Sequence, residues 1–199
     1  HIPEGAATVV QQLAPVPRMV IAFFIRNLRS GPQPEVPVHG GDLSQAVVER
    51  LQAEFGDRIL STSDAFGDSE ALVASKDWVE VARFLRDDEQ TQMDHFLDVT
   101  AIDYPQRESA RFDVTLMVRS STNNARILLR THVKEGEKLG TLSDVWLGAN
   151  WGEREVFDMF GIEFDGDLDM RRILIYEEFQ EHPLRKDYPI DKTQPLVPY

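Results

Sequence analysis

The sequence predicts an α+β fold: a mixed, largely antiparallel sheet with helices packed on one face, followed by an extended C-terminal tail. Three observations predict this fold. Residues 112–119 alternate apolar and polar side chains, residues 120–124 have the composition of a turn, and residues 126–133 return as a hairpin partner. Two amphipathic helical patterns precede the hairpin, near residues 43–55 and 75–86. Repeated prolines near the C-terminus favour extended backbone.

The chain is expected to divide into three parts. Residues 1–40 form a proline-rich arm or linker, residues 41–165 form the α+β domain, and residues 166–199 form an extended, basic and proline-rich docking tail. The apolar run from Met19 to Ile25 favours an arm that wraps a neighbouring protein, with a disordered tail as the alternative. Because the sequence begins with His1 rather than Met, the removal of a targeting peptide is left open.

The first half of the domain is predicted to contain two helices. Asp42 is expected to cap the first, over residues 43–55, and Gly56 to end it. Ser75 is expected to cap the second, over residues 75–86. The buried stripes of the two helices are expected to comprise Leu43, Val47, Leu51 and Phe55, and then Trp78, Val81, Ala82 and Leu85. Besides the hairpin, strands are expected at residues 59–62, 70–74 and 96–103.

The second half of the domain is predicted to contain two further helices. A short one is expected to start near residues 141–143, after a charged loop. Asn150 is expected to cap the next, with Glu153 at the capping-box position and Gly161 at its end. Within it, Arg154 and Asp158 are spaced to form a pair worth about 0.3–0.5 kcal/mol. Beyond Gly161 the chain is expected to be irregular and to leave its own domain.

The composition excludes several functions. A net charge of −13 and a pI near 4.8 argue against nucleic-acid binding and against adsorption to anionic lipid. The absence of cysteine excludes disulfides, thiolate zinc sites and thiolate-held iron–sulfur clusters. No apolar run approaches the roughly 20 residues that span a bilayer. An acidic surface serves solubility, or it meets a basic partner.

The most specific feature is a series of three motifs in the last quarter: EREVFDMFGIEF from Glu153 to Phe164, RRIL from Arg171 to Leu174, and HPLRKDYP from His182 to Pro189. Arginine is suited to bidentate pairing with carboxylates across an interface. The alternative is that these basic residues pair with the chain's own acids, including Glu153, Glu155 and Asp187.

A self-sufficient enzyme is the contrasting hypothesis. A metal or acid–base site could be assembled from Glu153, Glu155, Asp158 and His182, as in a stand-alone metal hydrolase. Their spacing does not match HExxH, and the sequence has no GxSxG, phosphate loop or GxGxxG. We therefore predict no catalytic, cofactor-binding or metal-binding residue in this chain.

The three motifs, together with FLDVTAIDYP at residues 96–105 and SDVWLGANWGERE at residues 143–155, resemble the thirty-kilodalton (C-type) subunit of NADH:quinone oxidoreductase, respiratory complex I. The similarity covers roughly residues 43–189. One departure is that the family usually has a His-Pro pair between Gly166 and Arg171, where this chain has Asp167, Leu168, Asp169 and Met170.

The resemblance implies a non-catalytic structural and assembly subunit of the peripheral arm, supporting electron transfer from NADH to quinone coupled to proton translocation. It implies docking beside the large forty-nine-kilodalton (D-type) subunit and the neighbouring cluster-bearing subunit. It also implies that FMN, iron–sulfur clusters, NADH and quinone bind to partner subunits rather than to this chain. The expected location is peripheral to the energy-transducing inner membrane, on the mitochondrial matrix or bacterial cytoplasmic side, with no span of its own.

An equivalent subunit of a related membrane-bound hydrogenase or of a dehydrogenase with another electron donor is the closest alternative. In either case the helix that begins near Glu153 and the C-terminal tail are expected to clamp the cofactor-bearing neighbours. The residues predicted to lie at this interface are Glu153, Arg154, Glu155, Asp158, Arg171, Arg172, His182, Arg185, Lys186, Asp187 and Tyr188.

Overall fold

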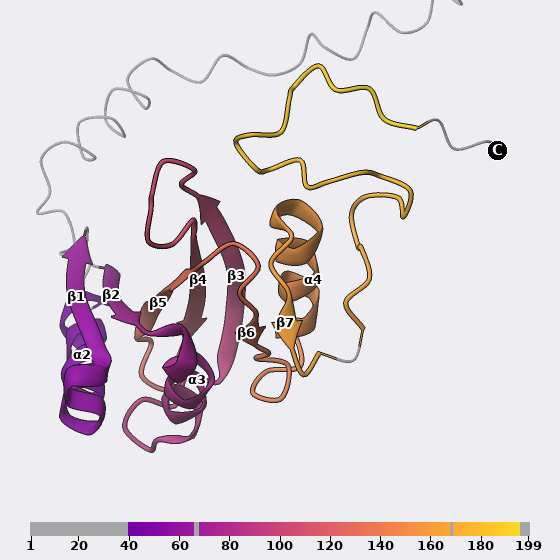
Figure 1. Cartoon of the computed structure of the whole chain (residues 1–199). Coiled ribbons are helices and arrows are strands. Elements are labelled where there is room, and N and C mark those ends of the chain that lie inside the picture. The colour runs from indigo at the N-terminus through magenta and orange to yellow at the C-terminus, as the bar shows by residue number, and fades with distance from the viewer. Residues whose placement is uncertain (1–39, 66–67, 168, 196–199) are drawn as a thin grey trace, which may run out of the picture. The chain divides into compact units, whose positions relative to one another are not determined.

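The computed structural model describes residues 40–65, 68–167 and 169–195. A five-stranded sheet has the strand order β1-β2-β5-β4-β3, and helices lie over one of its faces (Figure 1). In chain order the elements are α2 (Gly40–Phe55), β1 (Ile59–Ala65), β2 (Asp68–Val73), α3 (Trp78–Asp87), β3 (His95–Asp103), β4 (Phe112–Arg119), β5 (Arg126–Val133), β6 (Leu139–Gly140), α4 (Ala149–Phe160) and β7 (Phe164–Asp165).

The sheet is mixed and largely antiparallel, which confirms the predicted fold class. Antiparallel pairs join β1 to β2, β3 to β4 and β4 to β5, while β2 and β5 run parallel. The predicted β4–β5 hairpin is confirmed, and its register runs from Phe112 opposite Val133 to Arg119 opposite Arg126. The parallel pair arises because the chain leaves β2, passes through α3 and the outer strand β3, and returns beside β2 as β5.

The face of the sheet beneath the helices is apolar and forms the core. Helix α2 packs against β1, β2 and β5, and α4 packs against β3. The predicted stripe of α2 is confirmed at Val47, Leu51 and Phe55, but Leu43 is 40% exposed. Helix α3 buries the four predicted residues. The strands contribute to the core Ala71, Val73, Val99, Ala101, Phe112, Val114, Leu116, Val118, Ile127, Leu129 and Val133.

The opposite face of the sheet is polar and carries one buried carboxylate. Asp113 alternates with the core residues of β4, so its side chain points away from the helices, yet it is only 1% exposed. His132 Nδ1 lies 2.5 Å from Asp113 Oδ1, and Arg107 also pairs with this carboxylate. Burial alone would raise the pKa of Asp113, but the hydrogen bonds from Arg107 and His132 outweigh burial and lower it.

Two predicted helix caps are wrong. Helix α2 already begins at Gly40, so Asp42 lies in its first turn instead of before it. Ser75 begins a short 3₁₀ turn, and its hydroxyl donates to Glu137 Oε1 at 2.6 Å rather than capping α3. The hydroxyl therefore donates to a carboxylate from another part of the chain, instead of accepting from the backbone N–H groups at the start of α3.

The short helix predicted near residues 141–143 is also absent from the structure, which has turns over residues 142–148. The N–H groups of Val145 and Trp146 both donate to the carbonyl of Leu142 at 2.8 Å, which makes a single turn that does not continue as a helix. The N–H of Leu142 donates to Glu153 Oε1, so a side chain of α4 also holds this turn. Within these turns Trp146 is buried, whereas Leu147 is 89% exposed.

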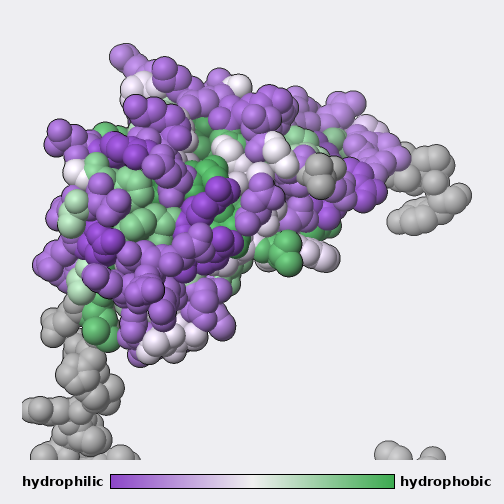
Figure 2. Space-filling model, turned by 90° about the horizontal axis from the view of Figure 1, so that it is seen from below, coloured by the Kyte–Doolittle hydropathy of each residue, from purple (hydrophilic) through white to green (hydrophobic). Residues whose placement is uncertain are grey.

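Beyond Gly161 the chain is irregular, as predicted, apart from β7, which pairs in parallel with β6. The expected N-terminal arm, with its apolar run from Met19 to Ile25, lies outside the described residues except for Gly40. In the part of the chain that the structure describes, no helix combines the length and apolar character needed to cross a membrane. Seen from below, the surface is mostly hydrophilic, with apolar residues in small groups (Figure 2).

Candidate interaction site at helix α4 and the C-terminal segment

Helix α4 lies close against the outer strand β3 because two glycines face that strand. A Cβ added at Gly152 would lie 2.6 Å from Val99 Cγ1, and one added at Gly148 would lie 3.6 Å from Phe96 Cδ1. The first contact is too short for any side chain. Glycine at position 152 therefore lets α4 approach β3 closely.

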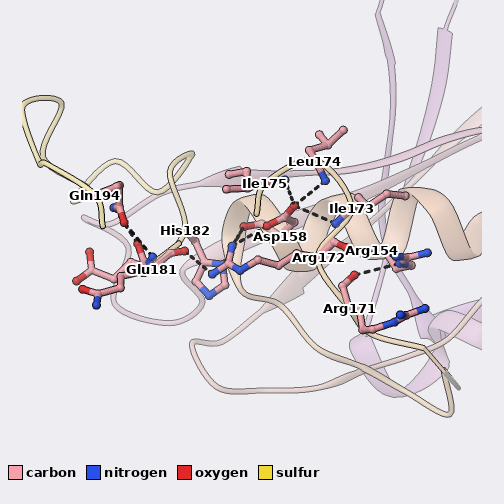
Figure 3. Close-up of polar contacts among 11 residues, drawn as sticks. Arg154, Asp158, Arg171, Arg172, Ile173, Leu174, Ile175, Glu181, His182 and Gln194 are labelled. Carbon is pink, nitrogen blue, oxygen red and sulfur yellow. Dashed lines mark hydrogen bonds and ion pairs between the residues drawn. The ribbon is translucent and has the colours of Figure 1, made fainter. Parts of the chain in front are cut away.

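Asp158 on α4 accepts hydrogen bonds from residues 172–175 of the C-terminal segment (Figure 3). Its side chain is fully buried, and its Oδ1 accepts a hydrogen bond from Arg172 Nη1 at 2.6 Å. Its Oδ2 accepts from three consecutive backbone N–H groups, at 3.1, 2.9 and 2.9 Å: those of Ile173, Leu174 and Ile175. One carboxylate on the helix therefore fixes the backbone of the RRIL motif.

The hydrogen bonds to Asp158 determine its charge. Burial alone would raise the pKa of Asp158, but the three backbone N–H groups and Arg172 outweigh burial and hold the pKa below its usual range. The guanidinium of Arg172 is itself largely buried, and its Nη2 donates to Glu181 O at 2.8 Å. The pair is thus an internal contact that joins α4 to residues 172–181.

The HPLRKDYP motif closes the C-terminal end of α4. The last four carbonyl groups of a helix have no partner within it. The carbonyl of Phe157 accepts from the N–H of Gly161 at 2.8 Å. The remaining three accept from the motif, at 2.9, 3.1 and 2.6 Å: Asp158 from His182 Nδ1, Met159 from the N–H of Leu184, and Phe160 from Arg185 Nε.

Gly161 makes this closure possible. Its φ of +75° is the left-handed conformation that ends a helix and favours glycine, as the sequence predicts. A Cβ at this position would lie 2.5 Å from the ring of His182 and 2.8 Å from Arg185 Nη2. Glycine therefore provides both the turn and the space for the two side chains.

His182 and Arg185 each have a second contact. The His182 ring meets Phe157 edge to face, with centroids 5.9 Å apart. Burial lowers the pKa of His182, and the nearby Arg185 and Arg172 lower it further, so that the ring is neutral at pH 7. Arg185 also pairs with Glu135 at 2.9 Å.

The motif is tied to the sheet through Asp103, a buried carboxylate at the end of β3. Asp103 accepts a bidentate pair of hydrogen bonds from Arg111, at 2.8 and 3.0 Å, and one from the backbone N–H of Lys186 at 2.8 Å. Arg111 also pairs with Asp187 at 2.8 Å. The expectation that the tail leaves its own domain is therefore wrong for this stretch, which packs back onto it.

Tyr188, the last residue but one of the motif, packs on the same segment. Its ring stacks on Phe179 with centroids 6.0 Å apart, and its hydroxyl oxygen accepts a hydrogen bond from Gln194 at 2.5 Å. The Lys186 ammonium lies 5.3 Å from the ring centroid of Tyr104. These contacts join residues 186–194 to Tyr104 and Phe179.

The predicted Arg154–Asp158 pair does not form. Arg154 donates instead to two backbone carbonyls, those of Arg171 at 3.0 Å and Arg172 at 3.3 Å. Arg172 pairs with Asp158 instead. Arg172 belongs to the segment whose backbone N–H groups also bond this carboxylate, so one carboxylate accepts from both the guanidinium and the backbone. Arg171 is exposed and pairs with Asp169 at 2.6 Å.

Glu153 is fully buried and does not form the predicted capping box. Helix α4 begins at Ala149, so Glu153 lies too far inside the helix to reach its first N–H groups. Its carboxylate instead accepts from three consecutive residues, at 2.6, 2.5 and 3.1 Å: Thr141 Oγ1, Leu142 N–H and Ser143 Oγ. Burial raises the pKa of Glu153, and these hydrogen bonds oppose the rise without cancelling it.

Asn150 lies within α4 and is not its cap. Its Nδ2 donates to both carboxylate oxygens of Asp167, at 2.9 and 3.0 Å. The Oδ1 of Asp167 also accepts from the N–H of Asp169 at 3.0 Å. The position where this sequence departs from the family's His-Pro pair therefore ties the start of α4 to the segment after β7.

The predicted interface residues thus fall into two groups. Those with buried or half-buried side chains hold the segment to its own domain: Glu153, Arg154, Asp158, Arg172, His182, Arg185 and Tyr188. Those with exposed side chains are Glu155, Arg171, Lys186 and Asp187. The alternative that the basic motifs pair with the chain's own acids is confirmed for Arg172, Arg171 and Arg185, although the acids are not the ones expected.

The four residues considered for a metal or acid–base site are not gathered into one. Glu153 is buried beside residues 141–143, Glu155 is exposed, and the His182 ring bonds the backbone carbonyl of Asp158 rather than its carboxylate. Across residues 40–65, 68–167 and 169–195, no group of three or more His, Cys, Asp or Glu side chains is placed to hold a metal ion. This geometry does not favour the hydrolase hypothesis.

Large exposed apolar side chains are the feature that sequence reasoning missed. Trp151 on α4 is 67% exposed. The large exposed apolar side chains on the C-terminal segment are those of Leu174, Tyr176, Leu184 and Ile190. For Trp151 the signal was available in the sequence: at about 100° per residue, Val156 and Phe160 lie roughly 140° and 180° around the helix axis from Trp151, which places Trp151 off the apolar side.

Comparison with known proteins agrees with the sequence motifs. The family described as "Respiratory-chain NADH dehydrogenase, 30 Kd subunit" matches residues 71–194, more than half of the chain. The C-type subunit of NADH-quinone oxidoreductase from Methylobacterium radiotolerans is 39% identical, over 77% of this chain and 71% of its own length. The same subunit of Ruegeria pomeroyi is 44% identical, over 70% of this chain and 69% of its own length.

Solved structures share the fold. A trypsin-resistant fragment of Nqo5 superposes with a TM-score of 0.55 and 26% identity, over 64% of this chain and 98% of the fragment. A chain of the archaeal membrane-bound sulfane sulfur reductase has a TM-score of 0.63, over 73% of this chain and 85% of its own. At 18% identity the second likeness concerns the fold alone. The motifs, the fold and the relatives together establish that this chain belongs to the family of the 30-kDa, C-type subunit of respiratory-chain NADH dehydrogenase.

Proposed function

We propose that this chain is a non-catalytic structural subunit of the peripheral arm of NADH:quinone oxidoreductase. One observation carries the proposal: the charged residues of the three motifs bond an irregular segment, residues 169–194, to α4. Asp158 and Arg172 fix its first half, and His182 and Arg185 fix its second half on the end of α4.

Such a fixed segment favours docking for an energetic reason. A flexible segment loses conformational entropy when it binds, at about 0.5–1.5 kcal/mol for each long side chain immobilised. Here the backbone is ordered by internal hydrogen bonds, while Leu174 and Leu184 remain 63% and 53% exposed. The internal contacts prepare the surface, and the exposed residues are available to contact a partner.

The proposed partners are the large D-type subunit and the neighbouring cluster-bearing subunit. The exposed ions of the predicted interface, Glu155, Arg171, Lys186 and Asp187, are of both signs and suit a polar rim around apolar contacts. On this proposal FMN, the iron–sulfur clusters, NADH and quinone are bound by partners. The chain lies on the matrix or cytoplasmic side of the membrane that holds the complex.

A subunit of a complex with another electron donor is the less favoured hypothesis. The relatives at 39% and 44% identity are named for NADH and quinone, whereas the likeness to the sulfane sulfur reductase chain concerns the fold alone. The proposal therefore names NADH as donor.

The test separates assembly from turnover. Arg154→Ala and Arg185→Ala in the complete complex should lower the amount of assembled enzyme, because each removes bonds that shape the docking segment. The rate of NADH:quinone turnover per assembled complex should stay at the wild-type value. Arg126→Ala is a matched control, since Arg126 is an exposed arginine on β5 paired with Asp68.

Two results would contradict the proposal. Normal assembly in both variants would show that these contacts do not prepare a docking surface. A fall in turnover per assembled complex, with assembly intact, would assign this chain a part in the chemistry.

A further inference from the structure

Helix α4 has one stripe that its own domain does not cover. Gly148 and Gly152 face β3, and Arg154 and Asp158 face residues 171–175. Residues at 100° intervals around a helix place Trp151 and Glu155 between these two sides. Both are exposed. Leu147, which is also exposed, lies in the turn that leads into the helix, two residues before Ala149, the first residue of α4.

The exposed tryptophan is exceptional in this chain. Trp78 and Trp146 are 0% and 6% exposed, whereas Trp151 is 67% exposed. A tryptophan can bury about 150–250 Å² of surface, and Trp is enriched among the residues that dominate binding energy at interfaces. Leu147, at 89%, adds a second exposed apolar side chain in the turn that precedes α4. Adjacent exposed residues of this size mark a contact surface more than they mark a solvated helix.

Glu155 determines which occupant fits. Among the ion pairs of the described residues none involves Glu155, so its carboxylate is available to a cation from outside. A second copy of this chain would bring its own Glu155 and a net charge of −13 to the contact. An anionic membrane surface would repel the same charges. A protein surface with a Lys or Arg beside an apolar pocket could bury the side chains of Leu147 and Trp151 and pair with the carboxylate of Glu155.

We propose that Leu147, Trp151 and Glu155 form a docking ridge that inserts into an apolar pocket, edged by a lysine or arginine, on a neighbouring subunit of the complex. The ridge deepens the proposed function and depends on it for the identity of the neighbour. It adds to the interface two residues, Leu147 and Trp151, that the charged motifs do not include.

The first test identifies the occupant directly. A photoreactive benzoylphenylalanine in place of Trp151, within the assembled complex, should cross-link to a different polypeptide. The cross-linked peptide should contain apolar residues and a Lys or Arg. A cross-link confined to this chain, to a second copy of it or to lipid would overturn the proposal, as would no cross-link from a complex that contains the labelled chain.

The second test measures strength. Trp151→Ala should weaken retention of this chain in the complex tenfold or more, because truncating a central interface tryptophan has an effect of at least this size. Leu60→Ala is the control, since Leu60 on β1 is 56% exposed and lies away from α4. Isolated Trp151→Ala protein should unfold at the wild-type denaturant midpoint. If the Trp151→Ala chain is retained in the complex as well as the Leu60→Ala chain, the proposal of a docking ridge is wrong.

A charge test completes the design. Glu155→Lys should weaken retention several-fold and reverse its dependence on salt, while Glu49→Lys on the exposed side of α2 should leave both unchanged. Equal effects of the two reversals would show that Glu155 has no cationic partner. If wild-type chain is itself absent from the complex, the proposed function fails and the ridge fails with it. If wild-type chain is present and Trp151→Ala is retained equally, only the ridge fails.

Discussion

Asp158→Asn is the substitution that most directly tests how the C-terminal segment is held. The change keeps the shape of the side chain but removes its charge and one acceptor oxygen. If the amide oxygen of Asn replaces Oδ2, the three backbone N–H groups keep their acceptor, and the amide NH₂ then faces Arg172. The buried cation loses its partner.

The expected cost follows from the burial of the pair. Breaking a buried ion pair on one side costs about 3–5 kcal/mol. Arg172 keeps its hydrogen bonds to the carbonyls of Glu181 and residue 158, so the lower end of that range applies, about 3 kcal/mol. This corresponds to a rise of about a hundredfold in the opening equilibrium of the segment.

Amide hydrogen exchange is the assay because it reports opening residue by residue. The N–H groups of Ile173, Leu174 and Ile175 should lose about a hundredfold of protection in the Asp158→Asn variant, while the central strand β5 loses less. Asp169→Asn is the matched control. Its partner Arg171 is exposed, with side-chain exposures of 70% and 40% for Arg and Asp, so the loss should stay below about 1 kcal/mol. Equal protection in the two variants would refute the reasoning.

Three further substitutions test the surroundings of α4. Glu153→Gln should shift the pH dependence of unfolding: burial raises the folded-state pKa of Glu153, so its contribution is fully present below about pH 4.5 and is lost as pH rises through the raised value. The wild type should therefore lose free energy of unfolding relative to the Gln variant between pH 4.5 and 7 in urea titrations, and a constant difference would contradict this. Gly161→Ala should cost about 2–4 kcal/mol by thermal unfolding, because the left-handed φ and the contact at 2.5 Å both oppose a Cβ; a cost below 1 kcal/mol would mean that the capping geometry is wrong. Gly152→Ala should destabilise by about 1–3 kcal/mol through overlap with Val99, and adding Val99→Ala should recover part of that loss in a double-mutant cycle, whereas additive losses would show that the two sites do not touch.

The fold was largely predictable because its elements carry clear periodicity. The alternation in residues 112–119 and the turn that follows predicted the central hairpin, and the structure confirms it. The parallel pairing of β2 with β5 was not predictable in this way, since it depends on which edge of the sheet the chain returns to after α3. The alternation of apolar and polar residues indicates which face of the sheet a side chain lies on, but it does not indicate which strands are neighbours.

Helix caps were poorly predicted for a related reason. The rule for a capping side chain assumes that the local N–H groups are its best partners. Ser75 instead found a carboxylate 62 residues away, and Glu153 found three donors 10 to 12 residues earlier in the chain. Long-range partners of this kind appear only when the chain is folded.

The contacts of the charged motifs were only partly predictable. The C-terminal segment was expected to leave its own domain, but it packs back onto α4 and β3. Arg154 was expected to pair with Asp158, but Arg172 occupies that position. Sequence spacing favoured the local pair, and tertiary structure favoured the pair that also satisfies three backbone N–H groups. Whether the exposed residues of the site contact partner subunits stays a prediction.

The most direct test of the central claim is to isolate this chain from its native source. The chain would be tagged, purified gently in detergent and analysed for co-purifying proteins by mass spectrometry. The account predicts recovery in a large assembly with flavin-binding and iron–sulfur subunits and with the D-type subunit. Recovery of the chain alone, without those subunits, would contradict it.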